Sequence, residues 1–319
     1  MTWPGCVPEE VSEEFSERQG ADGSFSLWSQ AFGEGFHSGR GALREARETF
    51  LAPSQLERFP PGARLKVVEV CVGTGTNLAL LMEACAARSI ALEWWGLELD
   101  PRPLQLALAA EGFRQPWQPS TLQTLEQLLA QGRWQGAGAS CHLLWGDARQ
   151  TLPALLEEQR GLIDLVWHDA FSPQRCPQLW TLEFLGATAE LLSAEGRWIS
   201  YCSAAAMREA LSLYGLHLVA LEIPQGLAST GHQWSGGTLG SFTPPGTSPL
   251  WREFSAMELD HLASTAGEPY RDPSGREDAV SILASRRAAQ SAALTSRRRA
   301  SSSVWRGSWG VGRKRTGDG

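Results

Sequence analysis

The sequence predicts a doubly wound α/β fold, in which helices cover both faces of a mostly parallel sheet. Three observations support this. An apolar, β-branched segment at 65–71 ends at a glycine-threonine loop that leads straight into a helical segment. Strand-like and helix-like segments then alternate as far as about residue 243, and three of the strands are followed closely by an acidic residue. Such a chain binds its ligand along the carboxyl edge of the sheet.

The expected elements follow from apolar periodicity. We expect seven strands, near residues 65–71, 92–98, 141–146, 162–168, 195–202, 216–223 and 235–243. Helices are expected near residues 77–88, 101–111, 120–131, 150–159, 178–193 and 204–214. Only Pro224 to Trp234 separates the last two strands, which is too short for a crossover helix, so these strands should pair antiparallel. A strand or hairpin around Ser24 to Ser29 and a helix from about Gly41 to Leu51 precede the sheet.

Length and composition favour one large domain with extensions. The chain has 319 residues and is 42% hydrophobic, enough to bury a large core. We expect an N-terminal extension or lid at 1–60, the main domain at 61–245, a C-terminal extension at 246–290 and a basic tail at 291–319. Nine Lys and Arg residues follow Ser281, against Asp318 alone, in a segment rich in Ser, Ala and Gly. This composition predicts a disordered arm that either binds nucleic acid or only aids solubility.

Cysteine usage and hydropathy indicate the cellular setting. The six cysteines form no CxxC pair, which argues against a zinc ribbon or a disulfide scaffold. No charged-then-apolar segment opens the chain, and no run of about 18 apolar residues could span a bilayer. We therefore expect a cytoplasmic monomer that neither enters a membrane nor needs a metal.

The glycine loop and the next two strand ends predict a cofactor site. Gly73 and Gly75 allow a sharp turn and a close backbone approach, although an ordinary strand-to-helix turn would look the same. No Lys follows Thr76, so this is not a phosphate loop. Glu98, about 25 residues beyond the loop, can accept hydrogen bonds from ribose hydroxyls, and Asp147 from an adenine amine. Each carboxylate alone could be a solvated loop residue or a helix cap, but together they predict a nucleoside-bearing cofactor. Further cofactor-binding residues are expected at each side of the loop, namely Glu69 and Asn77.

The segment from Ile163 to Trp180 carries a second signal. Its strand delivers Asp169 to the carboxyl edge of the sheet, and a loop stiffened by Pro173 follows. With Phe171 and Trp180 as flat apolar surfaces, this loop suits recognition of an amine or a base by hydrogen bonding and stacking. The alternative is that Asp169 only caps a turn.

Two other residues of this segment are ambiguous. His168 is either an exposed strand-end residue or a satisfied buried one, and it is a weak candidate for a general base. Arg175 could contact a phosphate or could be a solvated surface residue.

Three segments resemble a known family. They are DGSFSLWSQAFGEGFHSGRGALREARETFL at 22–51, VVEVCVGTGTNLALL at 67–81 and LIDLVWHDAFSPQRCPQLW at 162–180. They resemble the methyltransferase domain of the bifunctional enzymes that complete 5-methylaminomethyl-2-thiouridine at the tRNA wobble position. The resemblance implies a Rossmann-like, class I S-adenosylmethionine-dependent methyltransferase fold, which agrees with the seven strands and antiparallel final hairpin expected above.

The resemblance also implies a reaction and roles for residues. It implies that the chain binds S-adenosylmethionine and methylates the primary amine of 5-aminomethyl(-2-thio)uridine in tRNA. The glycine loop, Glu98 and Asp147 would bind the cofactor, and Asp169 would accept a hydrogen bond from the amine. The remaining positions give a substrate pocket with an N-terminal lid, comprising His37, Ser38, Gly41, Phe171, Pro173 and Trp180.

The chain departs from this family at two places. No segment with the size or fingerprint of a flavin domain follows Phe242, so we expect no flavin chemistry. The sequence GHQWSGGTLGSF at 231–242 replaces a basic segment that is usual in the family, which leaves the tRNA contacts open.

Three alternatives remain at this stage. An aminopropyltransferase of the spermidine-synthase type shares the fold and places an Asp after the fourth strand, although Arg175 stands where a second acidic pair is usual. An NAD-dependent oxidoreductase is disfavoured by the incomplete glycine fingerprint. The third is an inactive relative that only binds nucleic acid.

Overall fold

A nine-stranded mixed sheet forms the centre of the computed structural model, which describes residues 15–136, 138–222 and 235–311. Five parallel strands form its middle, and they are β4 (Arg64–Val70), β5 (Ala91–Glu98), β7 (Ala139–Trp145), β8 (Ile163–His168) and β9 (Leu192–Ser200). Beyond β9, the strands β11 (Gly237–Ser241) and β10 (His217–Leu221) pair antiparallel, as expected from the short connection between them. Part of that connection, residues 223–234, lies outside the described residues.

The sheet has two strands more than the seven expected. They are short edge strands, β6 (Arg133–Gly136) beside β7 and β12 (Trp251–Arg252) beside β10, and both pair antiparallel. The prediction of seven strands is therefore wrong in number. Segments of two and four residues are too short to show an apolar alternation, so nothing in the sequence pattern marks them.

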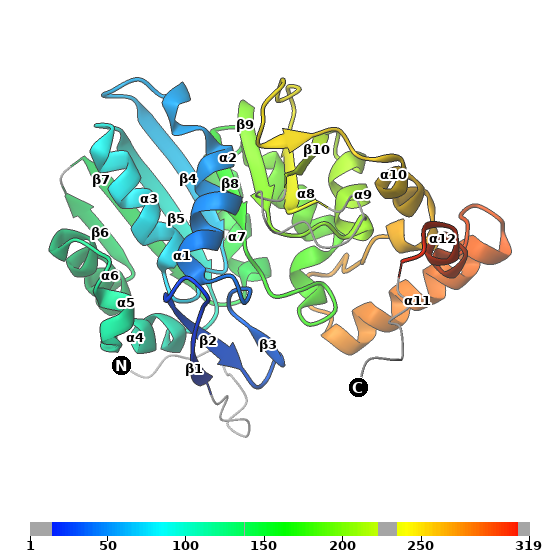
Figure 1. The fold of residues 1–319 in the computed structure, drawn as a ribbon, viewed down its shortest axis with the longest axis horizontal. Coiled ribbons are helices and arrows are strands. Elements are labelled where there is room, and N and C mark those ends of the chain that lie inside the picture. The colour runs from blue at the N-terminus through cyan, green and yellow to red at the C-terminus, as the bar shows by residue number, and fades with distance from the viewer. Residues whose placement is uncertain (1–14, 137, 223–234, 312–319) are drawn as a thin grey trace.

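Helices cover both faces of the sheet (Figure 1). On one face pack α3 (Thr76–Ala87), α4 (Arg102–Ala109), α6 (Pro119–Gln131) and the N-terminal run of α1 (Ala42–Glu45), a π-helical turn (Ala46–Leu51) and α2 (Ala52–Ser54). On the other face pack α7 (Ala148–Gln159), α8 (Leu182–Glu190) and α9 (Ala205–Leu213). Alternate side chains of a strand enter the two cores: Val67 packs in the first and Val68 in the second. The expected doubly wound α/β fold is confirmed.

One predicted helix is divided in two. The segment expected as a helix at 178–193 begins as a 3-10 turn (Pro177–Trp180), and α8 starts only after Thr181. The Thr181 side chain accepts a hydrogen bond from the Phe184 N–H, so it caps the new helix. Further 3-10 turns span Leu56–Arg58 and Thr265–Gly267, and a short helix, α5, spans Glu111–Arg114.

The N-terminal segment forms a separate small sheet of three antiparallel strands, β1 (Phe15–Gln19), β2 (Phe25–Ser29) and β3 (Glu34–Gly35). It contains the hairpin expected around Ser24 to Ser29. Figure 1 shows it in dark blue below the large sheet, close to the start of α1. This small sheet reaches the carboxyl ends of the parallel strands, where the loop after β8 meets it.

The C-terminal part is helical where the sequence predicts a disordered arm. After α10 (Ala256–Ala263), α11 (Ala279–Thr295) runs past the expected start of the arm, and α12 (Ser302–Trp309) follows. Trp305 of α12 is buried and stacks on His261 with ring centroids 3.9 Å apart. Arg299 forms ion pairs with Glu209 and Glu268. The acidic partners of these arginines lie far away in the chain, so the local composition could not reveal them and the segment looked disordered. The proposed domain boundaries stay predictions, although α11 crosses residue 290.

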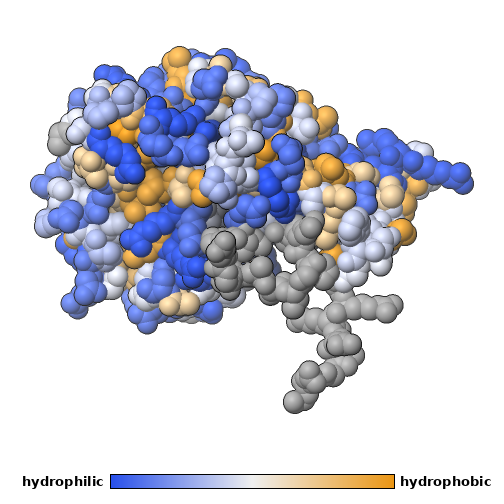
Figure 2. All heavy atoms as spheres, turned by 45° about the horizontal axis from the view of Figure 1, so that its top comes forward, coloured by the Kyte–Doolittle hydropathy of each residue, from blue (hydrophilic) through white to orange (hydrophobic). Residues whose placement is uncertain are grey.

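The C-terminal helices form a projection at the end of the molecule opposite α4 to α6 (Figure 1). Figure 2 shows one face of the molecule, where hydrophilic residues are the most common and hydrophobic residues form smaller patches between them. Among the described residues, no helix has the length and apolar character that a membrane span requires.

Candidate active site

A cavity of about 390 Å³ lies at the carboxyl edge of the sheet. Its walls come from the loops after β4, β5, β8 and β9, and from the N-terminal β3 and α1. The volume is in the range of small-molecule sites, about 300 to 1,000 Å³. The cavity contains many of the residues predicted for the site, namely His37, Ser38, Gly73, Asn77, Glu98, Asp169 and Phe171.

The glycine loop forms the floor of this cavity. Gly73 and Gly75 have φ angles of 55° and 81°, a region that suits glycine. A Cβ on Gly73 would lie 3.0 Å from the Phe36 ring, and one on Gly75 would lie 2.9 Å from Leu104. Both positions therefore need glycine for conformation and for space. Cys71, just before the loop, also has a positive φ of 67°, a strained conformation of the kind found at binding sites.

Glu98 is fixed by the backbone around it. One carboxylate oxygen accepts the Gly73 N–H at 2.8 Å, and the other accepts the Leu99 and Asp100 N–H groups at 2.7 and 3.0 Å. Burial raises the pKa of Glu98, and these hydrogen bonds oppose the shift. Each oxygen of a carboxylate has a further acceptor position, so Glu98 can still take hydrogen bonds from a diol. A rigid carboxylate beside a glycine loop fits the ribose of a nucleoside cofactor.

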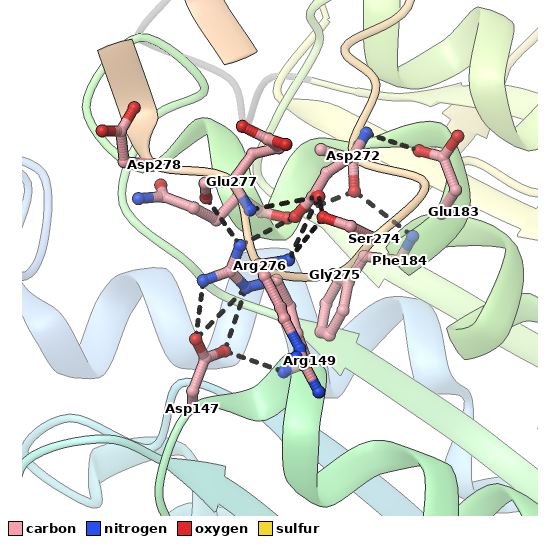
Figure 3. Close-up of polar contacts among 12 residues, drawn as sticks. Asp147, Arg149, Glu183, Phe184, Asp272, Ser274, Gly275, Arg276, Glu277 and Asp278 are labelled. Atoms are coloured by element: carbon pink, nitrogen blue, oxygen red, sulfur yellow. Dashed lines mark hydrogen bonds and ion pairs between the residues drawn. The ribbon is translucent and has the colours of Figure 1, made fainter. Parts of the chain in front are cut away.

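Asp147 lies outside the cavity lining. It caps α7 by accepting the Arg149 N–H, and its carboxylate pairs with the Arg149 guanidinium at 2.7 Å. Arg149 also pairs with Asp272 and donates to the Glu277 carbonyl, each at 2.8 Å (Figure 3). Asp147 therefore joins the end of β7 to the C-terminal extension. Its contact with an adenine amine stays a prediction.

Glu69 and Asn77 do not play the same part. Glu69 is fully buried on β4, outside the cavity lining, and accepts the Trp94 indole N–H at 2.9 Å. Burial raises its pKa to about 8. Asn77 does line the cavity, where its amide donates to the Asp169 carboxylate at 2.9 Å. The structure thus places Asn77 beside the predicted catalytic residue, and the predicted cofactor contacts of both residues stay untested.

Asp169 extends from the end of β8 into the cavity. Its backbone N–H donates to the Val70 carbonyl, which prolongs the pairing of β8 with β4 and fixes its position. Burial raises the pKa of Asp169 to about 8, the negative charge of Glu45 adds to this, and the hydrogen bond from Asn77 opposes it. A carboxyl group held in this way binds a proton or a cationic partner readily.

His168 and Trp180 are core residues. His168 is fully buried between Trp180 and Trp198, and its Nε2 forms a hydrogen bond with the Leu179 carbonyl. Burial lowers its pKa to about 4. Of the two interpretations of His168, the buried one agrees with the structure, but only Nε2 is satisfied, because the buried Nδ1 has no hydrogen-bond partner among the described residues. Trp180 and Pro173 do not line the cavity, and the Trp180 indole N–H donates to the Phe171 carbonyl. Trp180 thus supports Phe171 from behind.

The N-terminal sheet brings residues to the cavity that the sequence did not single out. Phe32 stacks on Phe171 with centroids 4.5 Å apart, and Phe36 meets Phe171 edge-on at 5.1 Å. Glu34 accepts hydrogen bonds from the N–H and Oγ of Ser172, at 3.0 and 2.9 Å. These contacts join the N-terminal sheet to the Asp169 loop, which is the position expected of a lid. The two Phe residues at 32 and 36 are the sequence feature that could have indicated this contact.

Of the residues expected in the lid, His37 and Ser38 line the cavity, whereas Gly41 does not. His37 lines the cavity and forms a hydrogen bond with the Ser26 hydroxyl, and burial lowers its pKa. The Ser38 N–H donates to Glu45 at 3.1 Å. Gly41 lies outside the lining and precedes α1. In the part of the chain that the structure describes, no three His, Cys, Asp or Glu side chains are grouped as a metal site would require.

Comparison with known proteins gives the class. A family model described as S-adenosyl-L-methionine-dependent methyltransferase matches residues 111–226. The tRNA 5-methylaminomethyl-2-thiouridine biosynthesis bifunctional protein MnmC of Acidovorax sp. is 31% identical over 203 residues, which is 60% of this chain and 31% of the relative. Its counterpart from Chromobacterium violaceum is 28% identical over 254 residues, 72% of this chain and 37% of the relative. The chain thus spans about a third of the length of these curated relatives.

Among solved structures, MNMC2 from Aquifex aeolicus matches with a TM-score of 0.71 and 27% identity, over 88% of this chain and 85% of that one. These comparisons support an S-adenosyl-L-methionine-dependent methyltransferase whose cofactor is S-adenosyl-L-methionine. Within this class, the resemblance to the methyltransferase part of the MnmC proteins is confirmed. Of the enzyme activities considered from the sequence, these comparisons support methyl transfer over aminopropyl and hydride transfer.

Glu98 gives the first prediction. Replacing Glu98 by Ala removes a carboxylate that can accept hydrogen bonds from both ribose hydroxyls. We expect a loss of about 1.5 to 3 kcal/mol in cofactor binding, a ten- to hundredfold weaker affinity by calorimetric titration with S-adenosylmethionine. Glu93→Ala on the same strand is a suitable control, because Glu93 lies outside the cavity and pairs with Arg64. Equal affinity in Glu98→Ala and wild type would place the ribose elsewhere.

Proposed function

We propose that this chain methylates the primary amine of 5-aminomethyl(-2-thio)uridine at the tRNA wobble position. The observation that supports this substrate is the half-buried Asp169 carboxyl group, which lies in the cavity beside stacked phenylalanines. A hydrogen-bond acceptor next to flat apolar surfaces suits an amine attached to a base. The names of the MnmC relatives point to the same nucleoside.

The chain's own residues hold and orient the acceptor. S-adenosylmethionine, when bound, supplies a methyl group on a positively charged sulfur. Asp169 accepts a hydrogen bond from the amine, so that the nitrogen lone pair points at the methyl carbon. A bond forms between nitrogen and that carbon while the carbon–sulfur bond breaks, and its electron pair stays on sulfur. An Asp169 oxygen stays hydrogen-bonded to the nitrogen while positive charge develops there, and the N-terminal sheet helps to exclude water.

Methyl transfer to defined tRNA tests this function. Full-length protein, S-adenosylmethionine and tRNA that carries 5-aminomethyluridine should yield 5-methylaminomethyluridine, seen by mass spectrometry of the nucleosides. The same tRNA with unmodified wobble uridine should gain no methyl group. Absence of product from the aminomethyl tRNA would reject this substrate and favour the inactive, nucleic-acid-binding alternative. A cytoplasmic location and a monomeric state stay predictions from the sequence.

The basic C-terminal residues give a second prediction. Arg298 and Arg299 form ion pairs with Glu268, so part of the basic charge stabilises the fold and is not available to tRNA. Deleting residues 312–319 removes three basic residues and leaves α12 in place. We expect weaker tRNA binding and a slope of log affinity against log salt that is smaller by at most about 2 to 3. Cofactor affinity should not change. Equal salt slopes for the two proteins would show that these residues do not bind tRNA.

A further inference from the structure

Three carboxylates gather at the Asp169 end of the cavity, and neutral groups hold all of them. Glu34 accepts from Ser172, Glu45 from the Ser38 N–H and Asp169 from the Asn77 amide. Within residues 15–136, 138–222 and 235–311, no Lys or Arg forms an ion pair with any of the three. Within the described part of the chain, no ion pair compensates the negative charge at this end.

The other end of the cavity differs. Asp100 pairs there with Arg102 at 2.5 Å, and both residues line the wall. Glu98 is surrounded by backbone N–H groups. Asp100 thus has a cationic partner and Glu98 accepts three N–H groups, whereas the three acids of the other end have fewer donors each and no cation. The less compensated charge belongs to the end where the methyl acceptor would lie. A ligand with a positive charge would complete this end of the cavity.

Glu45 is the least expected of these acids. It is the last residue of the one-turn helix α1, it is only 9% exposed, and it faces the cavity. Burial of a carboxylate without a cation is costly, so such a residue is usually paired. Its negative charge acts on Asp169, whose pKa it helps to raise after the larger effect of burial.

We propose that Glu45 and Asp169 form a two-carboxylate site that binds the methyl acceptor as a protonated amine. This inference rests on the proposed function. One proton then passes from the ammonium nitrogen to an Asp169 oxygen, which frees the lone pair that attacks the methyl carbon. Glu45 takes no part in this proton transfer. It is a positioning residue that strengthens Asp169 as a proton acceptor and balances the positive charge of the amine.

Among the described residues, no Lys or Arg lines the cavity beside the pair, although the Arg175 guanidinium packs near Gly33, next to Glu34. Burial lowers the pKa of His37, so its ring is neutral near pH 7. Burial raises the pKa of the Tyr201 hydroxyl and of the Cys71 thiol, so both are neutral as well. Glu34 and Glu69 are the other acids near Asp169, and neither brings positive charge. The protonated amine and the positively charged sulfur of the cofactor would be the cations at this end of the cavity.

The same charges predict specificity. An amine that bears an N-carboxymethyl group carries a carboxylate of its own, which would lie against Glu45 and Asp169. Like charges at close range in a buried site repel strongly. The site should therefore select a primary aminomethyl group and reject its N-carboxymethyl derivative.

Glu45→Gln tests this inference, with single-turnover transfer to tRNA bearing aminomethyluridine as the assay. We expect kcat/KM to fall about tenfold or more, mainly through KM, because charge balance for the cation is lost. The acidic limb of the kcat/KM profile should move to lower pH, since Asp169 loses the neighbour that helps to raise its pKa. Glu45→Asp should restore the wild-type limb. Glu48→Gln is the matched control, because Glu48 is in the next turn, lies outside the cavity and pairs with Arg40 and Arg44.

The outcomes separate this inference from the proposed function. Wild-type activity on aminomethyl tRNA, together with an unchanged KM and pH profile in Glu45→Gln, would overturn the two-carboxylate site alone. Wild-type transfer to the N-carboxymethyl derivative at an equal rate would overturn the specificity. Inactive wild type would reject the proposed function and this inference together. Calorimetric titration with S-adenosylmethionine shows whether Glu45→Gln is folded, and Glu45→Asp provides a second variant if it is not.

Discussion

Replacing Asp169 by Asn should lower methyl transfer to aminomethyl tRNA by about 10² to 10³ under single-turnover conditions. The amide keeps the size of the side chain and one acceptor oxygen. It loses the negative charge that attracts the protonated amine and the ability to take a proton from it. Cofactor affinity, measured by calorimetric titration, should stay within about twofold of wild type. A near-normal rate in this variant would remove Asp169 from the chemistry.

The same variant should be more stable than wild type. The pKa of Asp169 is raised to about 8 in the folded protein, above its usual value near 4. A raised pKa means that the folded state binds the proton more tightly, so this group favours folding at low pH. That contribution is lost as the pH rises from 4 through 8. Thermal unfolding without cofactor should therefore show a higher Tm for Asp169→Asn, with a gap that widens over this interval. A constant gap would contradict the raised pKa.

Residues that act through their own strand or loop could be predicted from the sequence. Gly73, Glu98 and Asp169 lie at or shortly after the carboxyl ends of parallel strands, and such strand ends meet at one edge whatever the rest of the chain does. The structure brings all three to one cavity. The alternation of strands and helices was sufficient to predict the fold for the same reason, because each strand-helix unit is formed by neighbouring residues.

Residues whose position depends on distant packing could not be predicted. Phe32 reaches the cavity because the N-terminal sheet docks on the Asp169 loop through Phe171, and Glu45 reaches it because α1 packs against α3. Asp147 also stands at a strand end, but Arg149 draws its carboxylate toward Asp272, a residue 123 positions beyond Arg149. No pattern of apolar residues encodes such ion pairs. The sequence therefore predicts the site residues at the carboxyl ends of the strands better than those that the N- and C-terminal extensions add around them.

A buried ion pair fixes the C-terminal extension to the sheet. Arg208 of α9 is 1% exposed and pairs with Glu258 of α10 at 3.0 Å. Its guanidinium also donates to the Thr238 hydroxyl, the Ser235 hydroxyl and the Gly237 carbonyl, on or just before β11. Burial raises the pKa of Glu258, but hydrogen bonds from Arg252, Ser255 and Arg208 outweigh this and lower it to about 2.

Arg208→Met should therefore lower the free energy of unfolding by about 3 to 5 kcal/mol, because it leaves the buried Glu258 with less compensation. The depressed pKa of Glu258 favours folding above pH 4.5, and that contribution is lost as the pH falls from 4.5 toward 2. The difference between variant and wild type, measured by urea unfolding, should thus shrink at low pH. Arg287→Met, an exposed arginine on α11, is the control and should change stability by less than about 0.5 kcal/mol. The double variant Arg208→Met, Glu258→Met should regain much of the loss, since no charge then stays buried alone. Two results would show that the pair does not hold the extension in place. One is a loss of unfolding free energy under about 1 kcal/mol in Arg208→Met. The other is a double variant whose loss equals the sum of the losses of the two single variants.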